Sequence, residues 1–383
     1  MKFLHTGDLH LGKTLNEFSL LADQEFFLEQ IITMAKENAV DAVILAGDIY
    51  DRSIPSTDAV LLLDRFLVAL TSAKIKVLMI SGNHDSAERV SFAGNILEKQ
   101  GLFIAGSLED FTECKKPKCV RLEDAYGEVA FVLLPFIRPA TVGAQTSREA
   151  VQLLLEGMEL PCERKVLVTH FFVTDGDRLP ELSDSETSVH VGGLDQVEAA
   201  LFADFDYTAL GHIHKPQQIG SKPVYYAGTP MKYSFSEVHQ TKSIQLITME
   251  EKGKVTVQKI PFKLHHDLRK IKGKLEELIS PEIVAAGNNQ DFLQVMLTDE
   301  EELIDPMGTL RSVYPNVCQI FYEKNEMTGT LGEPTLSVRN ASILELFEEF
   351  YLSVRGSELP RERALLVELL AKEAQELQEG GSL

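Results

Sequence analysis

Seven residues whose side chains commonly bind metal ions follow short apolar stretches of this sequence. They are Asp8, His10, Asp48, Asn83, His170, His212 and His214. Together they offer carboxylate oxygens, one amide oxygen and imidazole nitrogens, a mixed donor set suited to manganese, iron or zinc. Seven donors are too many for one ion, whereas the two oxygens of Asp48 can bridge a pair. We therefore predict a site for two metal ions.

Such a site has a definite chemistry. Two ions about 3.5–4 Å apart can clamp a phosphate, lower the pKa of a bridging water and stabilise the charge of a pentacovalent phosphorus. Because the set contains no thiolate, manganese or iron is favoured over a structural zinc. The predicted reaction is hydrolysis of a phosphoester. A buried histidine bonded to a carbonyl, or an aspartate capping a helix, explains any one of these residues but not all seven.

The elements that carry these residues share one pattern. The predicted strands 2–6, 43–46 and 75–80 run into Gly7-Asp8, Gly47-Asp48 and Gly82-Asn83. Ligands of open α/β sheets collect at the carboxyl ends of the strands, so these endings predict a common site. Strand 165–169 ends at His170, and strand 207–210 precedes Gly211-His212-Ile213-His214. Residues two apart in extended chain face the same side, so both histidines can point at one centre.

The rest of the chain predicts an alternation of helices and strands, typical of an α/β fold. We expect helices at 23–38, 57–72, 89–100 and 148–159, further strands at 102–105, 128–135 and 224–227, a hairpin of 243–248 with 254–259, an exposed basic turn at 115–118 and a mobile surface loop at 171–193. Near Pro261 the pattern changes to a small α+β domain with no ligand-type strand endings. A linker at 331–334 and amphipathic helices at 343–354 and 361–377 follow. A short helical tail has little core of its own, so we expect these helices to bind a partner.

Composition limits the classes of function. The chain has 383 residues, which suits two or three domains, and a hydrophobic fraction of 44%, which is enough for a buried core. Its formal net charge of -21 argues against wholesale wrapping of nucleic acid but not against a nuclease with local phosphate contacts. The four cysteines show no CxxC spacing, so we interpret them as plain thiols. With no long apolar run and no signal peptide, we expect a cytoplasmic protein.

The motifs resemble a known family. Asp8-x-His10, Gly47-Asp48-x-x-Asp51, Gly82-Asn83-His84-Asp85, His170 and Gly211-His212-x-His214 are similar to the calcineurin-like metallophosphoesterase signature, in the same order. The closer resemblance is to the nuclease subunits of bacterial SbcCD DNA repair complexes. It is carried by residues 5–12, 209–215 and 226–230 and covers nearly the whole chain.

The resemblance implies a fold and a set of roles. The fold would be a four-layer sandwich of two mixed sheets flanked by helices, with a nuclease domain at 1–262, a small α+β DNA-capping domain at 263–334 and a C-terminal helical segment at 335–383. One manganese would be held by Asp8, His10, Asp48 and His214, and the other by Asp48, Asn83, His170 and His212. Outside the metal shell, His84 would contact the phosphate or the leaving-group oxygen, and Asp51 would orient His84.

The implied function is a Mn²⁺-dependent DNA nuclease of repair and recombination, an exonuclease on double strands and an endonuclease on single strands and hairpins, with Fe²⁺ or Mg²⁺ as substitute metals. The SbcC ATPase would be its partner, in a heterotetramer built on a homodimer of this chain, associated with the nucleoid. The basic residues available to hold DNA are Lys13, Arg52, Arg89, Arg138, Lys215 and Lys232. Two alternatives stay open: a phosphoesterase of small substrates, and a scaffold that has lost catalysis.

Overall fold

The computed structural model describes residues 1–111, 114–156, 158, 160, 162–186, 195–301, 303–323 and scattered positions between 344 and 367. The chain divides into two units, Met1–Glu323 and Lys324–Leu383, and only the first is described in detail. The predicted linker and most of the two predicted C-terminal helices lie outside the described residues. Within the described part of the chain, no helix is long and apolar enough to cross a bilayer.

The first large sheet carries three of the predicted strand endings. Its strands, in order across the sheet, are β18 (Val255–Pro261), β17 (Ser243–Met249), β1 (Lys2–Thr6), β4 (Ala42–Ala46), β5 (Lys76–Ile80) and β6 (Leu102–Ala105). Strands β1, β4, β5 and β6 are parallel, whereas β17 pairs antiparallel with β1 and forms the predicted hairpin with β18. The carboxyl ends of β1, β4 and β5 therefore lie at one edge.

The second large sheet carries the remaining histidines. Its order is β15 (Gln217–Gln218), β16 (Val224–Tyr226), β14 (Tyr207–Gly211), β11 (Arg164–His170), β10 (Gly127–Leu134) and β9 (Lys118–Asp124). The four central strands are parallel, and the two edge strands run antiparallel to their neighbours. His170 is the last residue of β11, and His212 follows the end of β14.

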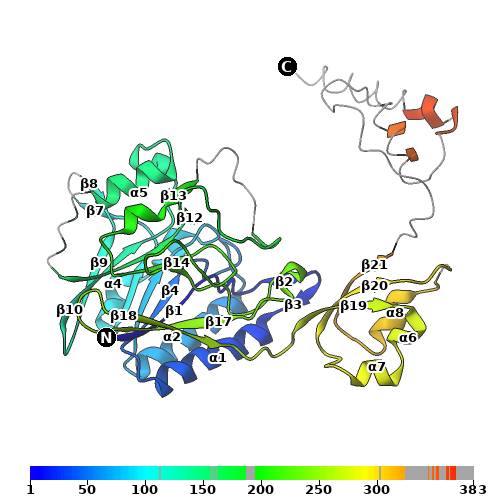
Figure 1. Cartoon of the computed structure of the whole chain (residues 1–383), viewed down its shortest axis with the longest axis horizontal. Coiled ribbons are helices and arrows are strands. Elements are labelled where there is room, and N and C mark those ends of the chain that lie inside the picture. Colours follow the sequence, from blue (N-terminus) through cyan, green and yellow to red (C-terminus); the bar gives the residue numbers. More distant parts are fainter. Residues whose placement is uncertain are drawn as a thin grey trace. The chain divides into compact units, whose positions relative to one another are not determined.

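The two sheets face each other and are covered by helices on their outer sides (Figure 1). A core between the sheets joins Phe3 and Ile44 of the first to Phe131 and Val168 of the second. Helices α1 (Leu21–Glu37) and α2 (Thr57–Ser72) share a second core with the first sheet, and α5 (Ser147–Leu155) shares a third with the other. Helix, sheet, sheet and helix make the predicted four-layer sandwich.

A smaller sheet follows in the sequence. Strands β19 (Leu268–Gly273), β20 (Phe292–Leu297) and β21 (Val317–Tyr322) are parallel and pack with the short helices α6 (Leu275–Leu278), α7 (Pro281–Ala285) and α8 (Pro306–Arg311) around a separate core. This domain contacts the sandwich through the hairpin of β2 (Thr14–Leu15) and β3 (Phe18–Ser19), where the rings of Phe18 and Phe292 lie 5.9 Å apart. A 2.7 Å ion pair joins Lys232 to Asp267.

Three local predictions were wrong. The expected helix 89–100 is broken into α3 (Ala87–Val90), α4 (Gly94–Leu97) and the 3-10 turn η1 (Glu98–Gln100), because Ala93 adopts a left-handed backbone with φ of 58°. The expected basic turn contains strand β8 (Cys114–Lys116) and the start of β9, where Lys118 is buried. The expected surface loop contains β12 (Phe172–Thr174), paired with β13 (Gln196–Glu198), although residues 187–194 lie outside the description.

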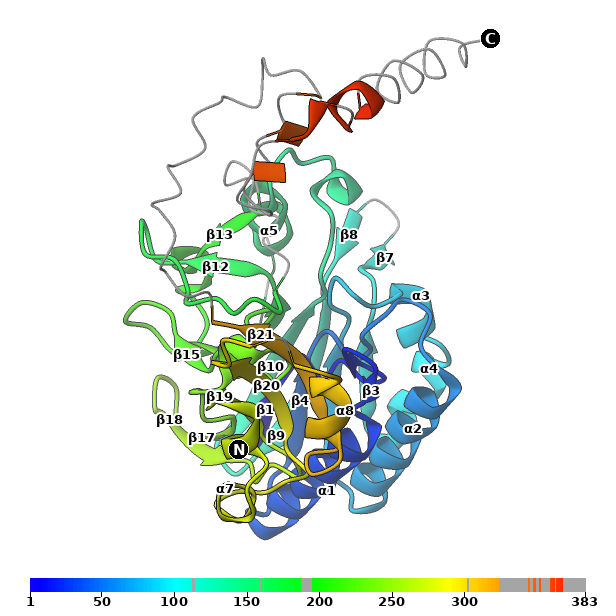
Figure 2. The same cartoon turned by 90° about the vertical axis from the view of Figure 1, so that its right-hand side faces the viewer.

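Minor elements complete the described chain, and Figure 2 shows the same molecule turned by 90°. They are β7 (Glu109–Phe111), which pairs with β8, and the 3-10 turns η2 (Pro139–Val142), η4 (Ala199–Phe202) and η5 (Phe235–Glu237).

Candidate metal centre

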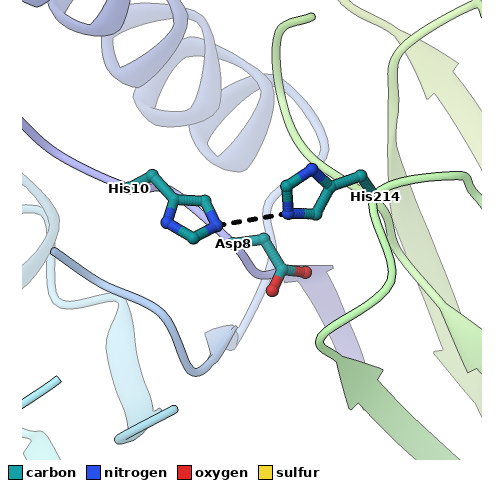
Figure 3. A group of neighbouring side chains, drawn as sticks. All are labelled: Asp8, His10 and His214. Atoms are coloured by element: carbon teal, nitrogen blue, oxygen red, sulfur yellow. Dashed lines mark hydrogen bonds between the residues drawn. The ribbon is translucent and has the colours of Figure 1, made fainter. Parts of the chain in front are cut away.

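The predicted ligands from both sheets meet at one place. Three overlapping groups of side chains have ligand atoms within 4.8 Å of one another: Asp8 with His10 and His214, Asp8 with Asp48 and His170, and His10 with Asp48 and His84. Figure 3 shows the first group, in which Asp8 and His10 come from the turn after β1 and His214 comes from the turn after β14. His10 and His214, 204 positions apart in the sequence, therefore face a common centre.

The first group has the features of a metal site. The Nε2 atoms of His10 and His214 lie 3.2 Å apart, so their ring nitrogens point at each other. Within the described residues, the buried Oδ2 of Asp8 has no hydrogen-bond partner, nor has the buried Nδ1 of His10. A buried carboxylate oxygen without a partner is costly, and a divalent cation would satisfy it. This donor set fits a divalent metal ion.

A second set of donors lies beside it. Asn83 Oδ1 is 3.0 Å from His170 Nε2 and 3.0 Å from His212 Nδ1. His170 donates its Nδ1 hydrogen to the carbonyl oxygen of Ala46 at 2.8 Å, which leaves Nε2 free to face the site. The structure thus brings together all seven residues that the sequence singled out.

Asp48 faces both sets of donors. Its Oδ2 lies 3.7 Å from Nε2 of His10 and 3.4 Å from Nε2 of His170, and its Oδ1 accepts a hydrogen bond from the backbone N–H of His84 at 2.9 Å. Only 2% of Asp48 is exposed. A buried carboxylate between two groups of imidazoles is placed as a bridging ligand should be.

Electrostatics keep this carboxylate ionised. Burial alone would raise the pKa of Asp48, but the charge and hydrogen bond of His170, with His10 beside it, hold that pKa well below its usual range. Burial likewise opposes a charge on His170, yet Asp48 and Asp8 raise the pKa of His170 to about 9. In the metal-free protein a proton on His170 therefore balances the carboxylate, in the position where a cation would do the same.

The glycines of the motifs are required by space as well as by turns. A Cβ on Gly82 would lie 2.1 Å from Asp48 Oδ1, one on Gly47 would lie 2.4 Å from His170 Nδ1, and one on Gly211 would lie 1.9 Å from the Ala46 carbonyl oxygen. Side-chain atoms do not approach so closely. The sequence indicated turns at these positions but not that the ligand side chains pack against the glycine backbones.

His84 and Asp51 meet differently from the prediction. His84 Nδ1 donates to the main-chain carbonyl oxygen of Asp51 at 3.0 Å, so the backbone of Asp51 orients the ring. The Asp51 carboxylate instead accepts from Lys13 Nζ at 2.7 Å and lies 3.7 Å from Nδ1 of His10. The side chain of Asp51 therefore faces the metal-side histidine His10, and any effect on His84 comes through the main chain.

Asp85 is a residue whose role the sequence did not indicate. Its carboxylate accepts from the backbone N–H groups of Gly82, Ile49 and Tyr50 at 2.8–3.0 Å. It thereby joins the turn after β5 to the turn after β4. Burial and the nearby Asp48 raise the pKa of Asp85 to about 6. Its place beside Asn83 and His84 marked it as a carboxylate of the motif, but only the fold shows what it joins.

The predicted DNA-binding residues differ in how accessible they are. The side chain of Arg52 is 80% exposed, and Arg89 and Arg138 are also exposed. Lys13 pairs with Asp51, and Lys215 pairs with Glu181. Lys232 is buried, and it donates to the Val238 carbonyl oxygen and to Asp267. The prediction that Lys232 is available to DNA is therefore wrong.

Comparisons with known proteins agree with this site. The family model described as calcineurin-like phosphoesterase matches residues 1–216, and the model described as type 5 capsule protein repressor C-terminal domain matches residues 265–355. The chain is 31% identical to SbcD, the D chain of the nuclease SbcCD, of Staphylococcus saprophyticus, over 96% of this chain and 97% of that protein.

Two solved structures were also matched. TT1561 of Thermus thermophilus shares 13% identity and covers 67% of this chain and 98% of its own, with a TM-score of 0.37. A dimetal phosphatase from Danio rerio shares 14% identity and covers 69% and 99%, with a TM-score of 0.40. The family model over more than half the chain, and the relative matched along nearly all of it, decide the assignment. The chain belongs to the calcineurin-like phosphoesterases, hydrolases that use divalent metal ions, and within them to the SbcD family.

Proposed function

We propose that this protein is a DNA nuclease that hydrolyses phosphodiester bonds with two Mn²⁺ ions, as a subunit of an SbcCD-type complex. The observation that carries the proposal is the convergence of seven ligand-type side chains around Asp48, which faces both groups of donors. Asp8, His10, Asp48 and His214 would hold one ion, and Asp48, Asn83, His170 and His212 the other. When bound, the ions would supply Lewis-acid activation of the phosphate and a hydroxide nucleophile.

His84 is the residue we propose for handling a proton. Its Nδ1 hydrogen is held by the Asp51 carbonyl oxygen, and its ring centroid lies 4.9 Å from that of His10. When the imidazole is protonated, Nε2 carries the second hydrogen and can donate it to a phosphate oxygen or to the leaving oxygen. The backbone N–H of His84 also holds Asp48, so a substitution of the ring should leave the bridge in place.

A DNA substrate is supported by the surface beside the metal centre. A cavity of about 350 Å³ is bordered by Lys13 and Tyr233 from the sandwich and by Lys270, Gln294 and Gln319 from the sheet of the small domain. These side chains offer ammonium and amide groups suited to a phosphate backbone. We propose that a strand passes here and that the small domain, predicted at 263–334, caps it. Arg52, Arg89, Lys13 and Lys215 would make local phosphate contacts.

The SbcD relative supports a partner as well, since its name places it in the nuclease SbcCD. We propose that the segment 335–383 binds the SbcC ATPase and that two copies of each chain assemble around the nuclease. The homodimer, the balance of exonuclease and endonuclease action and the nucleoid location stay predictions. Deleting residues 340–383 should abolish capture of SbcC while sparing hydrolysis of bis-(p-nitrophenyl) phosphate.

The test compares the purified protein with its His84→Ala variant on linear double-stranded DNA and on bis-(p-nitrophenyl) phosphate with Mn²⁺. General-acid catalysis is worth about 10²–10⁴-fold, so the variant should lose about that much rate on both substrates. Calorimetry should show that it still binds Mn²⁺. Hydrolysis of the small diester by an enzyme that leaves DNA intact, even with SbcC present, would contradict the proposed substrate. Loss of Mn²⁺ in the variant would contradict the role of His84.

A further inference from the structure

A buried polar cluster lies behind His214, on the side away from the other ligands. It consists of Ser183, Ser185, Glu186, Glu237 and Lys242. Glu237 and Lys242 have fully buried side chains and form an ion pair at 2.5 Å. Their backbones come from the turn η5 and from the residue before β17, whereas the serines come from the segment expected to be a mobile surface loop. The described part of that segment is therefore packed beneath the candidate metal centre.

The contacts of Ser185 connect this cluster to the ligand. Ser185 Oγ lies 2.8 Å from Nδ1 of His214 and 2.6 Å from Oε1 of Glu237. The carboxylate of Glu237 is kept charged by Lys242, so it can only accept, and the single hydroxyl hydrogen of Ser185 is donated to it. Ser185 must then accept from His214, which places the ring hydrogen on Nδ1 and leaves Nε2 bare toward His10 and Asp8.

Other contacts fix the main chain around the same ligand. Lys242 Nζ donates to the carbonyl oxygen of His214 at 3.0 Å, and the carboxylate of Glu186 accepts from the backbone N–H of His214. Ser183 Oγ reaches Glu237 Oε1 at 3.3 Å. The ring and both sides of the His214 backbone are thus held by groups that do not face the metal centre.

From these contacts we propose that Ser185 and Glu237 are positioning residues that fix His214 in the tautomer able to bind a metal ion. His170 has the equivalent support from a carbonyl oxygen of the main chain, whereas His214 obtains it from two side chains outside the family motifs. The inference rests on the proposed role of His214 as a ligand. Groups that hold the far nitrogen of a ligating histidine commonly change metal affinity by about 10–100-fold when they are removed.

The test measures the tautomer and the metal separately. In metal-free protein, the imidazole ¹⁵N shifts of His214 should show a protonated Nδ1 in the wild type and a loss of that preference in Ser185→Ala. Calorimetry with Mn²⁺ should show about 10–100-fold weaker binding in Ser185→Ala and Glu237→Gln. Ser185→Thr retains the hydroxyl and should restore both readouts.

The matched control is Ser236→Ala. Ser236 Oγ accepts from the backbone N–H of Asp184, so this variant loosens the same segment without touching His214 or Glu237. It should keep the wild-type tautomer and Mn²⁺ affinity within about threefold. The proposal is overturned if Ser185→Ala, folded by thermal melting, keeps both readouts, or if Ser236→Ala loses as much as Ser185→Ala. A wild type that binds no Mn²⁺ would instead overturn the proposed function, and the nitrogen shifts would still decide the role of Ser185.

Discussion

Replacing Gly82 with alanine tests how closely the backbone must approach the bridging carboxylate. The added Cβ would lie 2.1 Å from Asp48 Oδ1 and 2.4 Å from the Asp48 backbone nitrogen, whereas ordinary contacts begin at 3.4 Å. Either the carboxylate or the turn that carries Asn83 must then move by at least 1.3 Å, the difference between 3.4 and 2.1 Å. Both candidate metal sites use Asp48, so both would be distorted.

The size of the effect follows from that displacement. A misplacement of about 1 Å in a catalytic arrangement can cost about 100-fold in rate, and overpacking a buried site costs about 1–3 kcal/mol of stability. We therefore expect Gly82→Ala to hydrolyse bis-(p-nitrophenyl) phosphate about 100-fold more slowly, to bind Mn²⁺ more weakly and to melt a few degrees lower. Initial rates at saturating Mn²⁺ and calorimetry would measure the first two, and a thermal melt the third.

Gly94→Ala is the control. Its added Cβ would lie 3.9 Å from Ile104, an ordinary contact, so activity and melting temperature should stay close to the wild type. If Gly82→Ala matched the wild type in rate and in Mn²⁺ affinity, the bridging position assigned to Asp48 would be refuted, because no displacement of its carboxylate would then matter.

Three further predictions concern other parts of the site and the core. Asp51→Ala should lose less than about tenfold in rate, against two to four decades for His84→Ala, because the main chain of Asp51 holds His84; an equal loss in both variants would contradict this. Burial lowers the pKa of His5 to about 3, so the unfolded state binds a proton between pH 6.5 and 3 that the native state excludes. In metal-free protein, the free energy of urea unfolding should therefore fall as the pH falls through this window, and His5→Gln should remove about 1.4 kcal/mol per pH unit of that slope. Finally, Mn²⁺ at 100 times its dissociation constant should stabilise the fold by about 2.7 kcal/mol, so adding EDTA should lower the melting temperature by several degrees. An unchanged melt would argue against metal binding in the native state.

The fold was predictable where apolar runs and ligand-type endings coincided. Strand β1 and helix α2 match their predicted ranges, because an amphipathic helix with a Ser56 cap and a buried strand leave clear periodic patterns. The helix 89–100 failed because periodicity does not reveal a single left-handed residue, here Ala93. Residues 171–193 were polar and acidic enough to predict a loop, yet Ser183 and Ser185 are drawn inward by Glu237.

The site shows the same division between local and distant information. The ligands could be read from the sequence because each one follows its own strand. The groups behind them could not, since Glu237 meets Ser185 across 52 positions and Lys242 meets His214 across 28. Nothing local to Glu237 distinguishes it from a surface carboxylate. Only packing shows that it is buried and that its charge is balanced.

The ligand motifs are legible for a physical reason that joins backbone and metal chemistry. Asp8, His10 and Asp48 have φ between 43° and 53°, and His212 has φ of 99°. Aspartate, asparagine and histidine are the non-glycine residues most enriched in this left-handed region, because short polar side chains tolerate it best. They are also residues that bind divalent metal ions. A tight turn at the end of a buried strand therefore selects the same residues as the metal does, and each constraint strengthens the other in the sequence. The remaining strain would be offset by metal binding, so substitutions that relieve it, such as Asp8→Gly, should stabilise the metal-free fold less than they weaken the loaded one.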